Sequence, residues 1–291
     1  MERILPTSDL GFKKVLASEE NKDILAGLIK DFFEIKAEDI VIEKPYSIAV
    51  CKELIENEEV SKLRQTLKDV AASFKSADFV SEVQIRKTLF YEERALYYPF
   101  ERFVQNYSKI GTIKIGLDGK PLRYSSLRPI YALNILGYTL FEEDDDTLRI
   151  FELYDPKRNK RFKRLLRVGF FELGKTNIET VNQKHWRHYF NTGEASSEAP
   201  EYIKKASKII EYVNLSEEER NVMTAIERLE ANDQAEREYL IMESRAMGEA
   251  EGKLKIAKSM LEDGFKPEIV AKHTKLLLEY VMDIYKTIKG E

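Results

Sequence analysis

The sequence has little cysteine, few histidines and no long apolar run. Its 291 residues include one cysteine, Cys51, and three histidines. A single cysteine excludes an internal disulfide scaffold or a cysteine-rich zinc module, and a reducing compartment is the simple inference. No apolar stretch of about 18 residues occurs, and the N-terminus has no charged segment followed by an apolar run. These absences predict a soluble, cytoplasmic protein with no membrane segment.

Neither sign of charge dominates, and several catalytic motifs are missing. The 47 basic and 51 acidic side chains give a net charge of -4, which excludes a polybasic nucleic-acid coat and an acidic tail protein. The lack of a glycine-rich phosphate loop, a Walker-type lysine and a nucleophile elbow argues against ATP hydrolysis and serine-type hydrolysis. His185 and His188 flank Trp186 without an accompanying cysteine or glutamate ligand, so we expect a polar rim there and not a metal pair.

The residues that are present predict an α/β core followed by helices. A hydrophobic content of 43% with 15 tyrosines and 15 phenylalanines supplies a sizeable core, and the length suggests two units. We expect residues 1–192 to form the core, 193–250 a linker and charged helix, and 251–291 a small helical unit. Periodicity and composition predict helices at 19–34 and 89–108, the latter capped by Thr88 and kinked at Pro99, and strands at 40–48, 129–141, 148–154 and 165–173. The strand at 129–141 is the most apolar and should be central and buried.

A hairpin contains the residues that point to chemistry. Residues 68–74 and 79–85 both have a strand pattern, and the four residues between them suit a turn. With Phe74 opposite Phe79, counting outward places Asp69 opposite Gln84, and Ala71 opposite Glu82. Asp69, Glu82 and Gln84 then share one face, where neighbouring Cβ atoms lie roughly 5 to 7 Å apart.

Two carboxylates at that separation repel each other unless a divalent cation lies between them. Mg²⁺ suits such a site because it keeps several waters and takes only one or two protein carboxylates. The backbone carbonyl of Val83 is a further candidate ligand, and the open positions would accept a phosphate oxygen and an attacking water. This is the arrangement needed for metal-assisted phosphodiester hydrolysis. The alternative is that each carboxylate is simply a solvated residue at a strand edge.

A basic stretch follows the strands. Its seven cationic side chains are Lys157, Arg158, Lys160, Arg161, Lys163, Arg164 and Arg167. Such a local density suits a surface that tracks a phosphate backbone. A solvated loop that protects a strand edge by its charge explains the stretch equally well.

The chain also resembles a known family. The motifs that carry the resemblance are Thr7-Ser8-Asp9, Phe12-Lys13-Lys14, Asn21-Lys22, Asp69, Glu82-Val83-Gln84, Arg94 with Tyr97-Tyr98, and Pro129-Ile130. Over roughly residues 5–175 this order is similar to the PD-(D/E)XK nuclease family transposases, also called Rpn-type recombination-promoting nucleases. The resemblance implies a restriction-endonuclease-like core, in which helices flank a mixed central sheet, with a helical C-terminal extension. It also implies Mg²⁺ dependence, with Mn²⁺ as a substitute, and cleavage of double-stranded DNA.

Carried over by position, Asp69 and Glu82 match the family's acidic metal ligands. Gln84 stands where most PD-(D/E)XK enzymes have lysine, and its amide can orient water and phosphate but supplies no charge. Asp9 and Lys13 match the N-terminal motif, in which Asp9 either helps to bind the metal or only caps a helix, and Lys13 contacts DNA. Arg94 either reaches a phosphate or pairs with a neighbouring glutamate, and Tyr97 and Tyr98 are expected in the core.

The sequence is therefore consistent with three functions. The first is a metal-dependent DNA endonuclease linked to transposition or recombination, in which Asp69 and Glu82 hold the ion, Gln84 positions the water, and the basic stretch holds the DNA backbone. The second is a catalytically inactive DNA- or protein-binding module on a nuclease-like fold. The third is a structural oligomer built by the helices after residue 200. The last of them, from Ile256 to Lys289, suit a DNA-reading helix-turn-helix, an oligomerisation element or a protein-docking element, which leaves a homodimer open.

Overall fold

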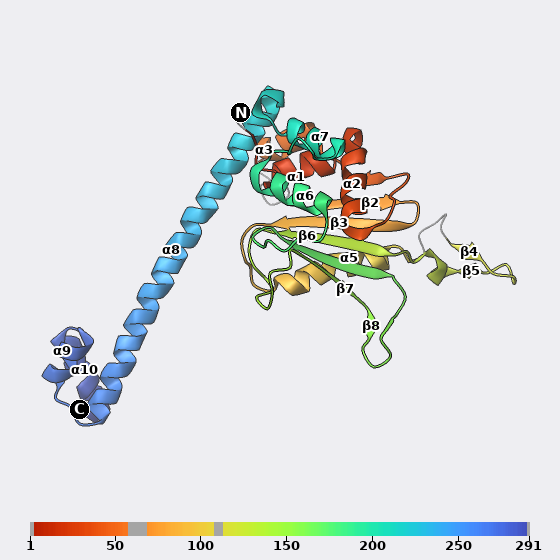
Figure 1. The fold of residues 1–291 in the computed structure, drawn as a ribbon. Coiled ribbons are helices and arrows are strands. Elements are labelled where there is room, and N and C mark those ends of the chain that lie inside the picture. The colour runs from red at the N-terminus through yellow and green to blue at the C-terminus, as the bar shows by residue number, and fades with distance from the viewer. Residues whose placement is uncertain (1–2, 58–68, 108–112, 290–291) are drawn as a thin grey trace. The chain divides into compact units, whose positions relative to one another are not determined.

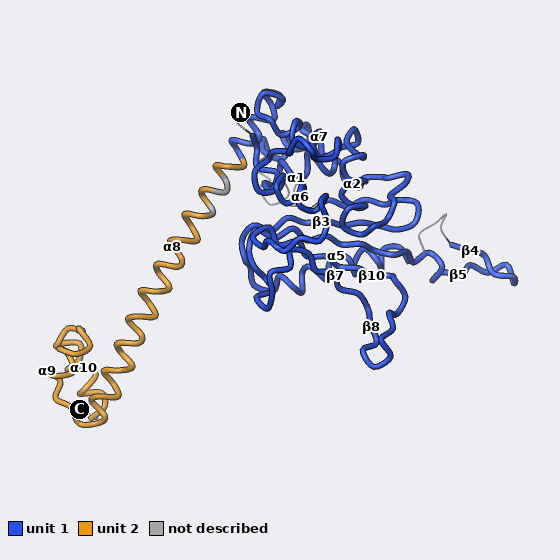
Figure 2. Tube along the Cα trace, in the orientation of Figure 1, with its two compact units in different colours: residues 1–225 blue, residues 226–291 orange. Residues whose placement is uncertain are grey.

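The computed structural model describes residues 3–57, 69–107 and 113–289 (Figure 1). The chain divides into two compact units, residues 1–225 and 226–291 (Figure 2). The boundary expected at residue 192 lies inside the first unit. Residues 193–225 stay with the core because Ile203 and Ala206 are fully buried, and because Glu219 pairs with Lys14 and accepts a hydrogen bond from the Tyr46 hydroxyl at 2.9 Å.

A six-stranded mixed sheet forms the centre of the first unit, with the strand order β1-β2-β3-β6-β10-β7. Its strands are β1 (Val41–Glu43), β2 (Asp69–Phe74), β3 (Ala77–Gln84), β6 (Ile130–Leu136), β7 (Leu148–Glu152) and β10 (Leu166–Glu172). β6 runs parallel to both β3 and β10, and the other pairs are antiparallel. All seven residues of β6 are buried, which confirms the predicted central strand. Two short hairpins lie outside the sheet: β4 (Lys114–Ile115) with β5 (Pro121–Leu122), and β8 (Tyr154–Asp155) with β9 (Lys160–Arg161).

Helices cover both faces of this sheet, so the predicted mixed α/β fold class is confirmed. One face is covered by α1 (Asp9–Leu16), α2 (Lys22–Phe33), α6 (Val181–Thr192) and α7 (Glu201–Ile209), and the other by α5 (Tyr91–Gln105) (Figure 1). The strand alternation divides the core accordingly. Phe32 of α2 packs edge-on against Phe171 of β10 with ring centroids 4.8 Å apart, whereas Tyr91 and Ala95 of α5 pack with Ala132 on the opposite face.

Two local predictions are wrong for identifiable reasons. The strand expected at 40–48 ends at Glu43, because Lys44 adopts a left-handed backbone (φ 49°) and Pro45 has no N–H to donate. Ser47 then caps α3 (Ile48–Glu56), accepting a hydrogen bond from the Val50 amide. In α5 the N-cap is Phe90 and not Thr88. The helix continues through Pro99, since proline removes only one helical hydrogen bond and Pro99 is buried on the side that packs against the sheet.

The second unit is a small helical bundle at the end of a long helix. α8 (Glu217–Glu262) spans 46 residues and continues into the region expected to form the small helical unit at 251–291. α9 (Pro267–Thr274) begins at Pro267, and α10 (Leu278–Lys289) follows. Ala257 and Leu261 of α8 pack with Val270, Val281 and Ile284 into one apolar cluster. Within the described ranges, no helix has the length and apolar content that a membrane crossing requires.

Candidate active site

The hairpin that carries the acidic residues has a different register from the one predicted. A two-residue turn, Lys75-Ser76, joins Phe74 to Ala77, and Ala72 pairs with Phe79. The predicted pairs of Phe74 with Phe79, Asp69 with Gln84 and Ala71 with Glu82 are therefore wrong by two residues. The turn is tighter because Asp78 belongs to the strand, where its fully buried carboxylate accepts a hydrogen bond from the Asn106 amide at 2.6 Å.

The shift brings the two acidic positions closer together. Because side chains alternate with a period of two, a slip of two residues leaves every side chain on its predicted face. Asp69 now pairs directly with Glu82 instead of lying diagonally from it, and directly paired residues have Cβ atoms roughly 5 Å apart. The backbone of Asp69 begins β2, while its side chain is outside the described part. Glu82 is buried, with 5% of its surface exposed.

Asn134 extends this row on the next strand and was missed by the sequence reasoning. It lies beside Glu82 in the register of β3 and β6 and is buried. Its amide oxygen accepts a hydrogen bond from the Tyr91 hydroxyl at 3.2 Å, and its amide nitrogen donates to the Gly169 carbonyl at 3.2 Å. These contacts fix the orientation of the amide. A lone polar residue inside the apolar run of β6 is the signal that would have identified it, since such residues are seldom buried without a role.

Arg94 of α5 holds the other two predicted site residues on β3. One guanidinium nitrogen, Nη2, pairs with Glu82 Oε1 and donates to Gln84 Oε1 at 2.6 Å. The guanidinium also lies over the ring of Tyr91, 5.1 Å from its centroid. Arg94 thus pairs with a glutamate, one of the two anticipated arrangements, and that glutamate is Glu82 of the site itself. The Gln84 amide nitrogen donates to the Arg86 carbonyl at 2.7 Å, so both ends of this side chain are engaged.

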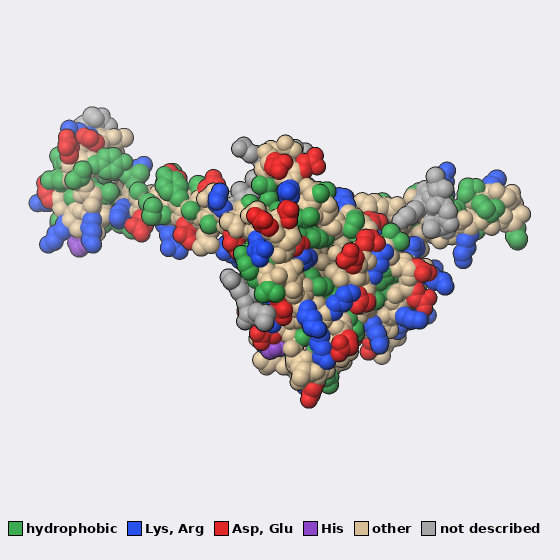
Figure 3. Space-filling view, turned by 90° about the horizontal axis from the view of Figure 1, so that it is seen from above, with side chains coloured by type: hydrophobic (Ala, Val, Ile, Leu, Met, Phe, Trp, Pro, Cys, Tyr) green, Lys and Arg blue, Asp and Glu red, His purple; other side chains and the backbone are tan. Residues whose placement is uncertain are grey.

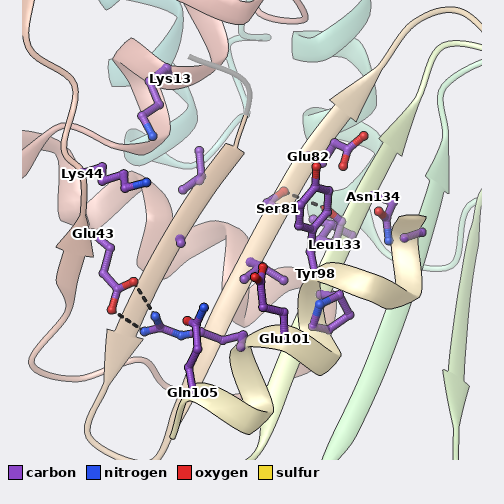
Figure 4. Close-up of a pocket in the computed structure, with 17 residues that line it drawn as sticks. Lys13, Glu43, Lys44, Ser81, Glu82, Tyr98, Glu101, Gln105, Leu133 and Asn134 are labelled. Carbon is purple, nitrogen blue, oxygen red and sulfur yellow. Dashed lines mark hydrogen bonds and ion pairs between the residues drawn. The ribbon is translucent and has the colours of Figure 1, made fainter. Parts of the chain in front are cut away.

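A cavity of about 390 Å³ opens beside Glu82 (Figure 4). Its other lining residues come from α1, β1 and the residue after it, β2, β3, α5 and β6. The polar ones are Lys13, Glu43, Lys44, Ser81, Tyr98, Glu101, Arg102, Gln105 and Asn134. Arg102 is neutralised within the wall, because it pairs with Glu43 and lies 3.3 Å from the Asp78 carboxylate. Of the tyrosine pair, Tyr98 lines the cavity, whereas Tyr97 is exposed. The prediction that Tyr97 lies in the core is therefore wrong.

Of the two N-terminal motif residues, Lys13 lines the cavity and Asp9 does not. Lys13 is 97% buried and lines the cavity. Ser8, and not Asp9, caps α1, because its hydroxyl oxygen accepts a hydrogen bond from the Gly11 amide at 3.2 Å. Asp9 is partly exposed and is not among the residues that line the cavity. Lys44 was missed in the sequence, where nothing distinguishes it from other surface lysines.

The basic stretch forms the β8–β9 hairpin and its return to the sheet. It meets β10 near Leu166. Leu166 pairs with Ile130 of β6, which in turn pairs with Asp78 of β3, and Asp78 is four residues before Glu82 on that strand. At about 3.3 Å per residue this is roughly 13 Å. Glu152 pairs with both Arg161 (2.8 Å) and Arg167 (2.7 Å). Part of the cationic charge of the basic stretch is therefore neutralised inside the fold.

Charge elsewhere on the first unit is mixed. On the face of the molecule in Figure 3, basic and acidic side chains alternate without a large area of one sign.

The donor set suits a divalent ion only if both carboxylates contribute. Among the residues whose side chains are described, no group of three or more histidines, cysteines, aspartates and glutamates is placed to hold a metal ion. Glu82 with the directly paired Asp69 position supplies the one or two carboxylates that Mg²⁺ takes from proteins. Val83 pairs with Ile135 one step beyond this row, and the role of its carbonyl as a ligand stays a prediction. Arg94 already pairs with Glu82, so an ion bound there shares this carboxylate.

Comparison with known proteins assigns the family. Neither the curated proteins nor the solved structures contain a match to this chain. The family model described as PD-(D/E)XK nuclease family transposase matches residues 6–239. The match covers most of the 291 residues, including the whole sheet, the Asp69–Glu82 pair and the cavity, and the chain therefore belongs to the PD-(D/E)XK nuclease family transposases.

Proposed function

We propose that this protein is a metal-dependent DNA endonuclease that hydrolyses phosphodiester bonds during transposition or recombination. Family membership gives it a nuclease-like role. The observation that carries the finer proposal is the direct pairing of Asp69 with Glu82 at the edge of a polar cavity. A buried carboxylate is retained at a cost in solvation, so its position beside a second acidic residue favours binding of a divalent cation over a merely structural role.

Asp69 and Glu82 would hold Mg²⁺, or Mn²⁺ in its place, with the Val83 carbonyl as a further ligand. When bound, such an ion lowers the pKa of a coordinated water and offsets the charge that develops on the phosphate. Arg94 fixes the Glu82 carboxylate and the Gln84 amide relative to each other. Asn134 is paired with Glu82, and Gln84 lies two residues further along β3. Their amides are the neutral hydrogen-bonding groups that we propose orient the water and the phosphate.

Double-stranded DNA is the proposed substrate. The exposed cations of the β8–β9 hairpin, Lys157, Arg158, Lys160, Lys163 and Arg164, would contact the backbone roughly 13 Å along the sheet from the acidic row. Arg158 and Arg161 contribute less, because they pair with Asp155 and Glu152. A duplex that reaches both places spans several phosphates, since successive phosphates on one strand are several ångströms apart.

One observation favours a second function, a catalytically inactive DNA-binding module. The Gln84 amide is engaged at both ends, by Arg94 and by the Arg86 carbonyl, and Arg94 also pairs with Glu82. If these contacts persist when DNA is bound, Gln84 cannot orient water. The protein would then bind duplex DNA without turnover.

A plasmid-nicking assay separates the two functions. Wild type, Asp69→Ala and Glu82→Ala are incubated with supercoiled plasmid in Mg²⁺, in Mn²⁺ and in EDTA, and circular dichroism checks that each variant is folded. We expect nicking by the wild type in either metal, and none in EDTA or by either variant. An Asp69→Ala protein that nicks at the wild-type rate would refute the metal site. Duplex binding in EDTA with no turnover in either metal would establish the inactive module.

A further inference from the structure

We propose that the β4–β5 hairpin is a DNA-contacting arm that inserts Leu117 between base pairs from the minor groove. Leu117 lies in the turn that joins the two short strands. The inference rests on the proposed function and deepens it, because it names a further contact with the same duplex and a deformation that this contact imposes on the DNA.

Apolar side chains of this hairpin lie in solvent on both of its faces. Leu117 is fully exposed, and Ile115 and Leu122 are each more than half exposed. Ile115 pairs with Pro121 and Lys114 pairs with Leu122, so strand alternation puts an apolar residue on each face of the ribbon. A two-stranded ribbon is marginally stable by itself. A cluster of exposed apolar groups, unlike a single one, marks a surface that another molecule covers.

The base of the hairpin is fixed to the rest of the first unit. The Lys114 amide donates a hydrogen bond to Ser125 Oγ at 2.7 Å. The ring of Tyr124 packs against the ring of Tyr107, which follows α5, with centroids 5.1 Å apart. These contacts join the hairpin to the segment after it and to the end of a helix, so the arm starts from a defined place.

The turn that carries Leu117 also has a defined geometry. The Gly119 amide donates to the Gly116 carbonyl at 3.0 Å, with Gly119 at φ 74°, a conformation that favours glycine. The Asp118 carboxylate accepts a hydrogen bond from the Lys120 amide at 3.2 Å. An apolar group on an ordered turn loses less conformational freedom when it is inserted into a partner. The hairpin therefore presents Leu117 ready for insertion.

The charge on the arm favours DNA over a second copy of this chain. Residues 114–124 contain three exposed cations, Lys114, Lys120 and Arg123, and one acid, Asp118. Lys120 and Asp118 are 3.8 Å apart at the surface, where such a pair is weak. A twofold contact between two arms would bring the cations of both copies together. A phosphate backbone instead neutralises them.

A second arm with the same mixture of residues leaves the sheet next to this one. η2 (Arg123–Ser126) follows β5 and leads into β6 at Ile130, while the β8–β9 hairpin leads into β10 at Leu166, and these two residues are paired. Figure 1 shows both hairpins beyond the same end of the sheet. Phe162 of the β8–β9 hairpin is exposed among cations, as Leu117 is. One duplex can therefore contact both arms.

Insertion of Leu117 deforms the DNA. Leucine is one of the side chains that proteins insert from the minor groove, and an inserted side chain unstacks two base pairs and kinks the duplex. The energetic cost depends on the sequence that is deformed, and it is smallest where the bases are already mismatched. We therefore expect the protein to prefer a mismatched duplex to a fully paired one.

Binding to two short duplexes tests the arm without turnover. One duplex is fully paired, and the other has a central mismatch with 2-aminopurine beside it; both are titrated in EDTA by fluorescence anisotropy. We expect wild type to bind the mismatched duplex about ten-fold more tightly and to raise the 2-aminopurine fluorescence, because the mismatch removes part of the unstacking cost. Leu117→Ser should lose both effects. Leu117→Met, which keeps an apolar wedge, should retain them.

Two further variants make the result specific. Val213→Ser removes an exposed apolar side chain from η3 (Tyr212–Asn214), in the first unit but outside the hairpin, and it should bind both duplexes as wild type does. Lys114→Gln combined with Lys120→Gln should make the slope of log K against log salt shallower by about 2. Circular dichroism checks that each variant is folded.

Several outcomes would overturn the arm. Equal affinity of wild type for the two duplexes would do so, and so would a Leu117→Ser protein that keeps the preference and the rise in fluorescence. A wild-type dimer in sedimentation that Leu117→Ser converts to a monomer would assign the hairpin to self-association instead.

The same measurements separate this inference from the proposed function. If wild type nicks plasmid and Asp69→Ala does not, but Leu117→Ser binds both duplexes as wild type does, the arm is refuted and the nuclease stands. If wild type nicks in no metal, yet its preference for the mismatched duplex is lost in Leu117→Ser, the nuclease proposal fails and the arm stands.

Discussion

The ion pair between Arg94 and Glu82 should be a measurable source of stability as well as an organiser of the site. Arg94→Met removes the guanidinium that contacts Glu82 and Gln84 and leaves a carboxylate that is 95% buried. Breaking a buried pair in this way costs about 3–5 kcal/mol. The Arg94 side chain is 27% exposed, so water screens part of the interaction, and we expect a loss of about 2–3 kcal/mol.

A double-mutant cycle isolates the pair from other effects of the substitutions. In a Glu82→Gln background the charge at residue 82 is gone, so Arg94→Met should cost about 1.5–2 kcal/mol less than in wild type. Urea unfolding followed by tryptophan fluorescence suits this chain, because its one tryptophan, Trp186, is fully buried in the first unit. The signal therefore reports the unit that contains the pair, even if the second unit unfolds separately.

A matched control makes the result specific to the buried pair. Arg149→Met is the same substitution at an arginine whose partners, Glu143 and Asp144, are exposed, and we expect a much smaller loss of stability. A coupling between residues 82 and 94 below about 0.5 kcal/mol would refute the reasoning. It would mean that the contact is too solvated to fix the carboxylate for metal binding.

Three further results are expected. Burial raises the pKa of the Cys51 thiol to about 11 despite the nearby charge of Lys13. A thiol reagent at pH 8 should therefore label the native protein slowly and the urea-unfolded protein at once, and fast labelling of the native protein would contradict this. Replacing Lys157 and Lys160 by glutamine should make the slope of log K for duplex binding against log salt shallower by about 2, whereas an unchanged slope would show that the β8–β9 hairpin does not contact the backbone. Lys175→Met should destabilise the first unit by about 3–5 kcal/mol in urea, because Lys175 and Glu172 are a buried pair 2.8 Å apart; a loss within error of zero would contradict it.

Local sequence patterns determined the elements and their faces. The alternation of apolar and polar residues in β2 and β3 placed Asp69, Glu82 and Gln84 on one face, and the apolar run in β6 predicted a buried central strand. These features depend only on neighbours along the chain and on the period of two in a strand, so they can be read without the fold. The order of motifs also identified the family, which the family model supports over residues 6–239.

The tertiary structure decided which residues meet. The hairpin register depends on Asp78, which stays in the strand because Arg102 and Asn106 of a distant helix bind it. Asn134 lies beside Glu82 through a parallel pairing between strands about 50 residues apart. Arg94 pairs with Glu82 from α5, and Lys13 and Lys44 line the same cavity. Pairing of this kind is fixed by long-range packing and burial of charge. Local sequence therefore determined which face carries the acidic pair, while the contact of Glu82 with Arg94 and the cavity beside it exist only in the folded chain.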